Sequence, residues 1–279
     1  AACYVASGKA ERYQENGTYL WDIIAGAAIV KSAGGLVEIT NQRDNFQVDV
    51  VFSNSKIKKY YMKSLVWLRN DLRMDDNPAL RKACINSDEV HCIYIYSLEQ
   101  MKLHNDANCK IEFIINNLKD LDNSLQKIGV PLTVIDSNGY ADNPKKILDV
   151  VQERSISKEY WNNTFGVDEN IRDSEVKEVL NSNDIIFESF DDQVVYAPGK
   201  IKTKEDKPYS VFTPFKRRWI ENFDIDFLDI EFNYSSKNSS GINSNVNEFN
   251  FEFVKSHSVD MSLWKTGELN AMSILNDYL

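Results

Sequence analysis

The chain has 279 residues, of which 43% are hydrophobic and 27% charged, a composition typical of a folded globular protein. Its formal charge at pH 7 is −10. Such an excess of acidic residues argues against a chain that binds nucleic acid unaided, because that binding depends on Lys and Arg neutralising phosphates. No apolar run approaches the ~20 residues of a membrane span and the four cysteines form no paired motif, so we predict a cytoplasmic protein without membrane contact.

Residues 1–61 differ in charge from the rest of the chain. They carry seven Lys and Arg against six Asp and Glu, whereas residues 62–279 carry 25 against 36. Met62 stands at the join and is followed at once by a strand-like apolar run. We therefore predict one domain piece before Met62 and a second that begins there, as if two proteins were joined.

The informative string of the first piece is WDIIAGAAIVKSAGG, residues 21–35, in which a Trp-Asp pair opens a helix of small residues. With Glu15 before it and the run from Phe52 to Asn54 after it, this string resembles the C-terminal signature of inositol monophosphatases, which are Mg²⁺-dependent phosphoesterases. The resemblance implies that Asp22 is a metal ligand and that Glu15 contacts an inositol hydroxyl. One carboxylate does not hold a pair of Mg²⁺ ions, so we expect an incomplete site, and strands without their sheet partners.

From Met62 onward, apolar runs rich in Val, Ile and Tyr alternate with helical patterns, as in a parallel sheet built from βαβ units. Asn-Pro pairs at residues 77–78 and 143–144 mark two helix starts, and a third helix over 110–128 ends at Gly129. The fold class is therefore α/β, with a five-stranded parallel Rossmann-like sheet. Its predicted strands cover residues 64–68, 89–96, 130–135, 158–161 and 184–190.

A family resemblance covers most of this second piece. VWLRNDLRMDDNPAL, residues 66–80, is followed by Asp-Glu and Arg-Asp pairs within 168–173, by the run 197–219 and by Trp-x-x-Gly-Glu at 264–268. In this order the motifs resemble the α/β antenna domain of DNA photolyases and cryptochromes. The resemblance implies a bound light-harvesting pigment and, in the intact parent, FAD and the light-driven repair of pyrimidine dimers.

The predicted pigment site lies outside the carboxyl ends of the strands, where ligands of open parallel sheets bind. By resemblance, Glu169 accepts hydrogen bonds from the pterin of a methenyltetrahydrofolate-type antenna, and Asp168, in place of the usual Asn, weakens that binding. His104 is a candidate from the same side. Ser97 stands where deazaflavin-using relatives carry an acidic residue, which favours folate. The alternatives are two solvated acids favoured by the helix dipole and a surface histidine.

The turn after the first strand carries Arg69 and Arg73 with acidic residues close by in sequence. Internal ion pairs with Asp71, Asp75 and Asp76 are the favoured interpretation, and contact with a ligand is the alternative. This turn lacks the glycines that let a backbone approach a phosphate. We therefore assign it mainly a structural role.

The last part of the chain is less regular. The aromatic run 209–215 predicts packing against the α/β domain, with base stacking as the alternative, and a short helix follows over 214–222. Residues 233–261 are rich in Asn and Ser and predict a linker with little core. Residues 262–279, helical from Glu268, resemble the start of a truncated FAD-binding domain.

We thus divide the chain into an inositol monophosphatase-like fragment (1–61), an antenna domain (62–232), a linker (233–261) and the start of an FAD-binding domain (262–279). The predicted function is pigment binding without catalysis. Its partner is the missing FAD-binding domain, and damaged DNA is reached only through that domain. FAD is not expected in this chain, and Mg²⁺ only if the phosphatase site were complete. The alternatives are a Mg²⁺-dependent phosphoesterase fragment and a non-catalytic interaction module.

Overall fold

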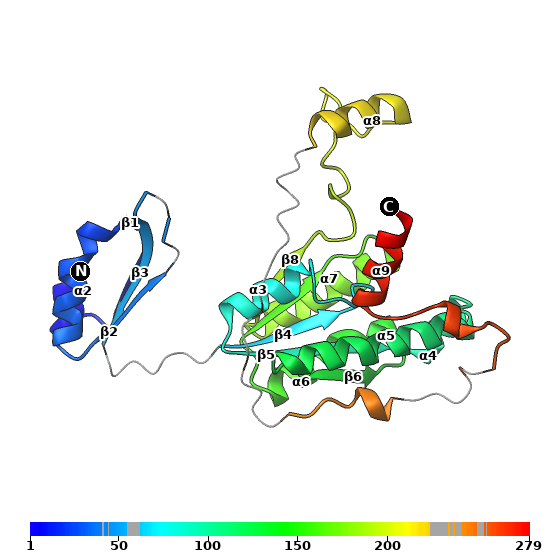
Figure 1. Cartoon of the computed structure of the whole chain (residues 1–279), viewed down its shortest axis with the longest axis horizontal. Coiled ribbons are helices and arrows are strands. Elements are labelled where there is room, and N and C mark those ends of the chain that lie inside the picture. Colours follow the sequence, from blue (N-terminus) through cyan, green and yellow to red (C-terminus); the bar gives the residue numbers. More distant parts are fainter. Residues whose placement is uncertain are drawn as a thin grey trace. The chain divides into compact units, whose positions relative to one another are not determined.

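The computed structural model describes residues 1–40, 42–43, 45–54, 62–223, 234, 237, 242–249, 254 and 256–279. The chain divides into two compact units, Ala1–Tyr61 and Met62–Leu279, whose elements are labelled in Figure 1. The division falls at Met62, where the charge balance of the sequence changes.

The first unit packs helices against one face of a three-stranded antiparallel sheet of strand order β1-β3-β2. In β3, Val48, Val50 and Phe52 are buried and alternate with more exposed residues, so a single face of the strand meets α2. The strands pair with one another, contrary to the expectation that they lack sheet partners. The elements are α1 (Ala2–Ala6), β1 (Arg12–Tyr19), α2 (Leu20–Ser32), β2 (Leu36–Thr40) and β3 (Gln47–Ser53).

The second unit contains the predicted five-stranded sheet, and the prediction that all strands are parallel is confirmed. The strand order is β6-β5-β4-β7-β8, so the chain moves outward to one side of β4 and then returns to the other side. Such a reversal leaves a crevice at the carboxyl ends of the central strands. The strands are β4 (Lys63–Leu68), β5 (Glu89–Tyr96), β6 (Leu132–Asp136), β7 (Lys158–Asn162) and β8 (Ile186–Phe190).

Helices cover both faces of this sheet, which explains why its strands are nearly continuously apolar. One core cluster joins the sheet to α3 (Pro78–Asn86) and α5 (Asn108–Lys127), and the other joins it to α6 (Asn143–Glu153) and α7 (Val167–Ser182). Asn77 caps α3 as predicted, accepting a hydrogen bond from the Leu80 amide at 3.1 Å. The short helix α4 (Leu98–Leu103) was not predicted; Ser97 caps it.

Part of the predicted linker is packed against the sheet edge. The side chain of Asn245 bonds to both the amide and the carbonyl of Val134, at 2.7 and 3.0 Å, and so stands in for a neighbouring strand. Val246 is fully buried in the core, and Val254 packs against Ile111 and Ile115 of α5. Residues 242–249 and 254 therefore contribute to the core, contrary to the expectation from their composition; most other residues of 233–253 lie outside the described part.

The prediction that the aromatic run 209–215 packs against the α/β domain is wrong. Helix α8 (Phe212–Glu221) has no buried residue, and Phe212 is 71% exposed. Its rings instead contact one another and nearby aromatic residues, for example Trp219 with Tyr196 and with Phe223 at centroid distances of 5.6 and 5.3 Å. The last helix is α9 (Glu268–Tyr278). No helix among the described residues is both long and apolar enough to cross a membrane.

We predict that the second unit, Met62–Leu279, folds without the first. The sequence suggested residues 62–230 as the independent part, but the burial of Val246 and Val254 adds the later segment to it. A chain of residues 62–279 should therefore melt cooperatively, whereas one ending at residue 232 should lose about 3–6 kcal/mol of unfolding free energy through the two missing valines. Urea denaturation of both chains tests this, and equal stabilities would contradict it.

A buried carboxylate generates a second prediction. Glu159 of β7 is fully buried, and neither of its side-chain oxygens has a hydrogen-bond partner among the described residues. Burial raises its pKa from 4.5 to about 8. The folded state therefore holds the proton more tightly than the unfolded state, and stability due to this group is lost as the pH rises from about 4.5 through about 8.

Replacing Glu159 with Gln should remove this pH dependence. We expect Glu159→Gln to gain stability relative to the parent chain between pH 5 and pH 9, measured by urea denaturation at both values. Glu175→Gln, which removes the same charge from an exposed position on α7, is the control and should show no such gain. A stability difference that does not change with pH would refute a protonated Glu159.

Candidate functional site

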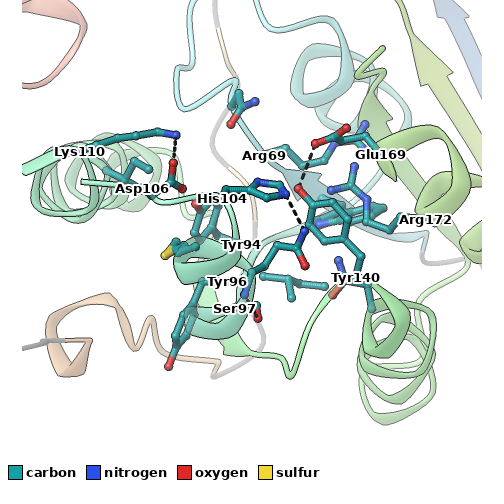
Figure 2. A pocket seen from close by; sticks show the side chains of 17 residues that line it. Arg69, Tyr94, Tyr96, Ser97, His104, Asp106, Lys110, Tyr140, Glu169 and Arg172 are labelled. Carbon is teal, nitrogen blue, oxygen red and sulfur yellow. Dashed lines mark hydrogen bonds and ion pairs between the residues drawn. The ribbon is translucent and has the colours of Figure 1, made fainter. Parts of the chain in front are cut away.

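A pocket opens at the carboxyl ends of β4, β5 and β6, beside the start of α7 (Figure 2). Consecutive strand ends in a parallel sheet lie at the same edge, which is why residues far apart in sequence meet here. The lining side chains come from the end of β4 (Trp67, Arg69), the end of β5 (Tyr94, Tyr96, Ser97), α4 and α5 with the loop between them (Gln100, His104, Asp106, Lys110), the segment after β6 (Tyr140) and α7 (Glu169, Arg172).

A stack of aromatic rings and guanidinium groups forms one wall of this pocket. The guanidinium carbon of Arg69 lies 4.6 Å from the ring centre of Trp67. Arg172 lies over two rings, 4.7 Å from that of Trp67 and 4.8 Å from that of Tyr140. Such contacts are attractive because the face of an aromatic ring is electron-rich.

Asp173 holds the two arginines in place. Arg69 Nη1 donates to both carboxylate oxygens of Asp173 at 2.8 Å, and Arg172 donates to Oδ1 from Nε at 3.0 Å and from Nη2 at 2.8 Å. All three side chains are buried. Burial lowers the pKa of the Arg69 guanidinium, and the charge of Asp173 opposes that shift. A fixed pair of cations therefore lies against the pocket.

The arginines after β4 thus form internal ion pairs, as predicted, but chiefly with partners other than the predicted ones. Arg69 binds Asp173, and Arg73 binds Asp192 at 2.7 Å, while the nearby Asp76 is 3.8 Å from Arg73. Asp71 has another role: it accepts hydrogen bonds from the amide of Arg69 and the side chain of Asn162 and so shapes the turn. Arg69 also lines the pocket, so contact with a ligand remains the alternative for this residue.

Glu169 lies in the first turn of α7 and faces the pocket. Its Oε1 accepts a hydrogen bond from the hydroxyl of Tyr140 at 3.1 Å (Figure 2). Burial, and then the charge of Glu169, raises the pKa of Tyr140 to about 12. A Cβ at position 166 would collide with Glu169 Oε2, so Gly166 lets this carboxylate fold back over the helix start.

The other candidates from the sequence lie at or outside the rim. His104 lines the pocket from an exposed position, where its ring nitrogen pairs with the Gln100 amide at 2.9 Å and its ring meets Tyr140 edge-on. Asp168 is exposed and is not among the lining residues. Ser97 lines the pocket and caps α4, accepting a hydrogen bond from the amide of Gln100.

Sequence reasoning missed Tyr140, Trp67 and Lys110 as lining residues. Tyr140 follows the predicted third strand, and Trp67 lies near the end of the first, so each stands at the ligand-binding edge of the sheet. An inventory of aromatic residues at strand ends would have found both. Lys110 forms an ion pair with Asp106 at 2.5 Å. No sequence pattern marks it as a lining residue, because its place at the pocket depends on where α5 begins.

The arrangement suits a flat heteroaromatic molecule. A carboxylate backed by a tyrosine can accept N–H groups from the edge of a ring system, while the wall of aromatic rings and guanidinium groups offers flat surfaces. The rim adds Lys110 and His104 for polar or anionic substituents.

The first unit brings its two candidates into no comparable site. Asp22 is exposed in the first turn of α2, and Glu15 on β1 accepts a hydrogen bond from the hydroxyl of Tyr13. Across the described residues, no three His, Cys, Asp or Glu side chains gather closely enough to hold a metal ion.

Comparisons with known proteins confirm both resemblances. Residues 64–232 match the model of the DNA photolyase family, and residues 1–74 match that of the inositol monophosphatase family. The two matches overlap over residues 64–74, but the structure assigns β4, which lies in both, to the parallel sheet of the second unit.

The matching proteins are longer than this chain. The deoxyribodipyrimidine photo-lyase of Escherichia coli strain K12 is 35% identical over 158 residues, which are 56% of this chain and 33% of that protein. Cryptochrome-1 of Arabidopsis thaliana is 29% identical over 155 residues, 56% of this chain and 22% of that protein. The chain thus spans about a third or less of these relatives.

Solved structures show the same fold. A bacterial class III photolyase from Agrobacterium tumefaciens superposes with a TM-score of 0.67 at 23% identity, over 81% of this chain and 46% of that one. An archaeal photolyase from Sulfolobus tokodaii, described with two FAD molecules and a novel light-harvesting cofactor, gives a TM-score of 0.54 at 21% identity, over 77% and 46%.

For the first unit we predict no hydrolysis of inositol monophosphate in the presence of Mg²⁺. Two metal ions need several carboxylates, and Asp22 and Glu15 form no such cluster in the described part of the chain. Phosphate release by the purified chain and by Asp22→Asn measures this. Turnover that disappears in the variant would contradict the prediction.

Proposed function

The chain belongs to the DNA photolyase family, and we propose on this basis that its α/β domain binds a light-harvesting antenna pigment. The observation that carries the proposal is the pocket at the carboxyl ends of β4, β5 and β6, which combines the carboxylate of Glu169 with a wall formed by Trp67, Tyr140 and Arg172. A ligand site at this edge is what the sheet topology favours.

A reduced folate of the methenyltetrahydrofolate type fits the donors and acceptors of the site. The pterin edge carries an amino group and a ring N–H, both donors, and the Glu169 carboxylate is acceptor-only when ionised. Tyr140 donates one hydrogen bond to Oε1, and an ionised carboxylate has about four lone-pair sites, so the group keeps capacity to accept from the pigment. The carboxylates of the folate tail would meet Lys110 and His104 at the rim.

The proposal extends to the light-driven DNA repair that full-length photolyases perform. Repair of pyrimidine dimers would require an FAD-binding part, and we propose that α9 begins it. The carboxylate of Glu268 accepts hydrogen bonds from the backbone amides of Met74 and Asp75, at 2.9 and 2.8 Å. These bonds attach α9 to the turn that carries Arg69. We propose that FAD and damaged DNA bind that part rather than the α/β domain. A cytoplasmic location fits its free cysteines.

The proposal predicts that Glu169 is the main polar anchor of the pigment. A charge-assisted hydrogen bond contributes about 1.5–3 kcal/mol, so Glu169→Gln should weaken methenyltetrahydrofolate binding about ten- to a hundred-fold. Asp168→Asn is the matched control, because it removes the same charge from the neighbouring exposed position. It should tighten binding, since it only removes a repulsive carboxylate.

Titration of the chain with methenyltetrahydrofolate, followed by near-ultraviolet absorbance and fluorescence, gives these affinities. Equal affinity of the parent chain and Glu169→Gln would remove Glu169 from the site. A chain that shows no pigment absorbance at all would instead favour a non-catalytic interaction module.

A further inference from the structure

Four electron-rich side chains, Trp67, Tyr94, Tyr96 and Tyr140, line the proposed pigment pocket, and the guanidinium of Arg172 lies over two of their rings, those of Trp67 and Tyr140. Trp67 and Tyr140 carry the indole and phenol rings that lose an electron most readily among side chains, and both rings lie in the wall described above. Arg172 is placed between them, 4.7 Å from one ring centre and 4.8 Å from the other, and Figure 2 shows its guanidinium beside Tyr140.

An excited heteroaromatic pigment is an oxidant toward such neighbours. If Trp67 gives it one electron, the products are a pigment radical anion and an indole radical cation. If Tyr140 gives the electron, its phenolic proton passes along the existing hydrogen bond to Glu169, leaving a neutral tyrosyl radical and a protonated carboxyl group. Return of the electron, and of the proton, restores the ground state, and the excitation is lost as heat.

A fixed positive charge over the ring opposes that first step. The attraction between a guanidinium and a neutral ring becomes repulsion once the ring is oxidised. Arg172 cannot easily turn away, because its Nη2 also donates to Thr164 at 3.2 Å and its side chain is buried. Arg69 adds a second guanidinium over Trp67.

The negative charge nearby does not cancel this effect. Asp173 carries one negative charge against the two positive charges of Arg69 and Arg172, so this cluster keeps a net positive charge beside the rings. Glu169 acts in the opposite direction, since a carboxylate that accepts the Tyr140 proton makes oxidation of that phenol easier. Tyr140 is therefore a competent electron donor that is restrained only by the guanidinium over its ring.

We propose that Arg172, assisted by Arg69, suppresses electron donation from Trp67 and Tyr140 to the excited pigment, so that the excitation survives long enough to be passed on. The inference rests on the proposed pigment-binding function. It assigns Arg172 an electrostatic role that acts through two other residues, in addition to its place in the pocket wall.

The fluorescence lifetime of bound methenyltetrahydrofolate tests this inference in the full chain. Arg172→Met removes the charge but keeps an unbranched side chain, and should shorten the lifetime at least about two-fold. Adding Trp67→Phe and Tyr140→Phe to that variant should restore the lifetime, because phenylalanine is a poor electron donor. Arg217→Met, which removes an exposed arginine from α8, is the control and should leave the lifetime unchanged.

Two further variants keep the test decisive if Arg172→Met does not fold. Trp67→Phe and Tyr140→Phe in the otherwise unchanged chain should not lengthen the lifetime, because the guanidinium groups already suppress electron donation from both residues. A longer lifetime in either variant would overturn the inference. Absorbance titration measures the fraction of pigment bound in each case. If Arg172→Met is folded and binds the pigment with an unchanged lifetime, the inference alone is refuted. If the parent chain does not bind the pigment, the inference and the proposed function are both refuted.

Discussion

The pocket depends on the buried ion pairs that the carboxylate of Asp173 forms with two arginines. This carboxylate binds Arg69 from the end of β4 and Arg172 from its own helix, and so ties α7 to the central strand of the sheet. Removing one partner of a buried ion pair typically costs about 3–5 kcal/mol, because the remaining charge is left uncompensated. Here two guanidinium groups would be left, both pressed against Trp67. The geometry of the wall, the position of Tyr140 and the start of α7 beside Glu169 all follow from this one carboxylate.

The opposite wall of the pocket depends on a segment beyond the residues that match the family model. Phe249 packs edge-on against Tyr96 with 4.4 Å between ring centres, and Val254 lies in a cluster with Met101; Tyr96 and Met101 both line the pocket. The polar side chains of Ser244 and Asn245 attach the same segment to β6. A stretch whose composition resembles a linker therefore supports the site, because a few well-placed residues are enough to fix a segment on a sheet edge.

The sheet could be predicted well because its strands and helix starts are marked by residues close together in the sequence. Strands covered on both faces read as continuous apolar runs, and the Asn-Pro pair before α3 marks a helix start within a few residues. The pairing of Arg69 with Asp173 was missed because the two residues lie 104 positions apart and the nearer acids looked equally suitable. The aromatic residues of α8 were misplaced for a related reason: aromatic content predicts packing but does not identify the surface packed against. Glu169 was found through family resemblance, whereas its partner Tyr140 required the fold.

The two candidate sites place different demands on the fold. Every residue of the proposed pigment pocket lies between Trp67 and Arg172, and parallel strands bring their carboxyl ends to one edge without help from other domains. The sheet, with the helices and loops that follow its strands, therefore supplies the whole lining of this pocket. A two-metal phosphoesterase site instead needs several carboxylates held at fixed distances, and in the first unit Asp22 and Glu15 lie on different elements with no third acidic partner gathered near them in the described residues. The first unit forms a helix-on-sheet core from its own apolar residues. The packing of this core therefore does not depend on metal ligands.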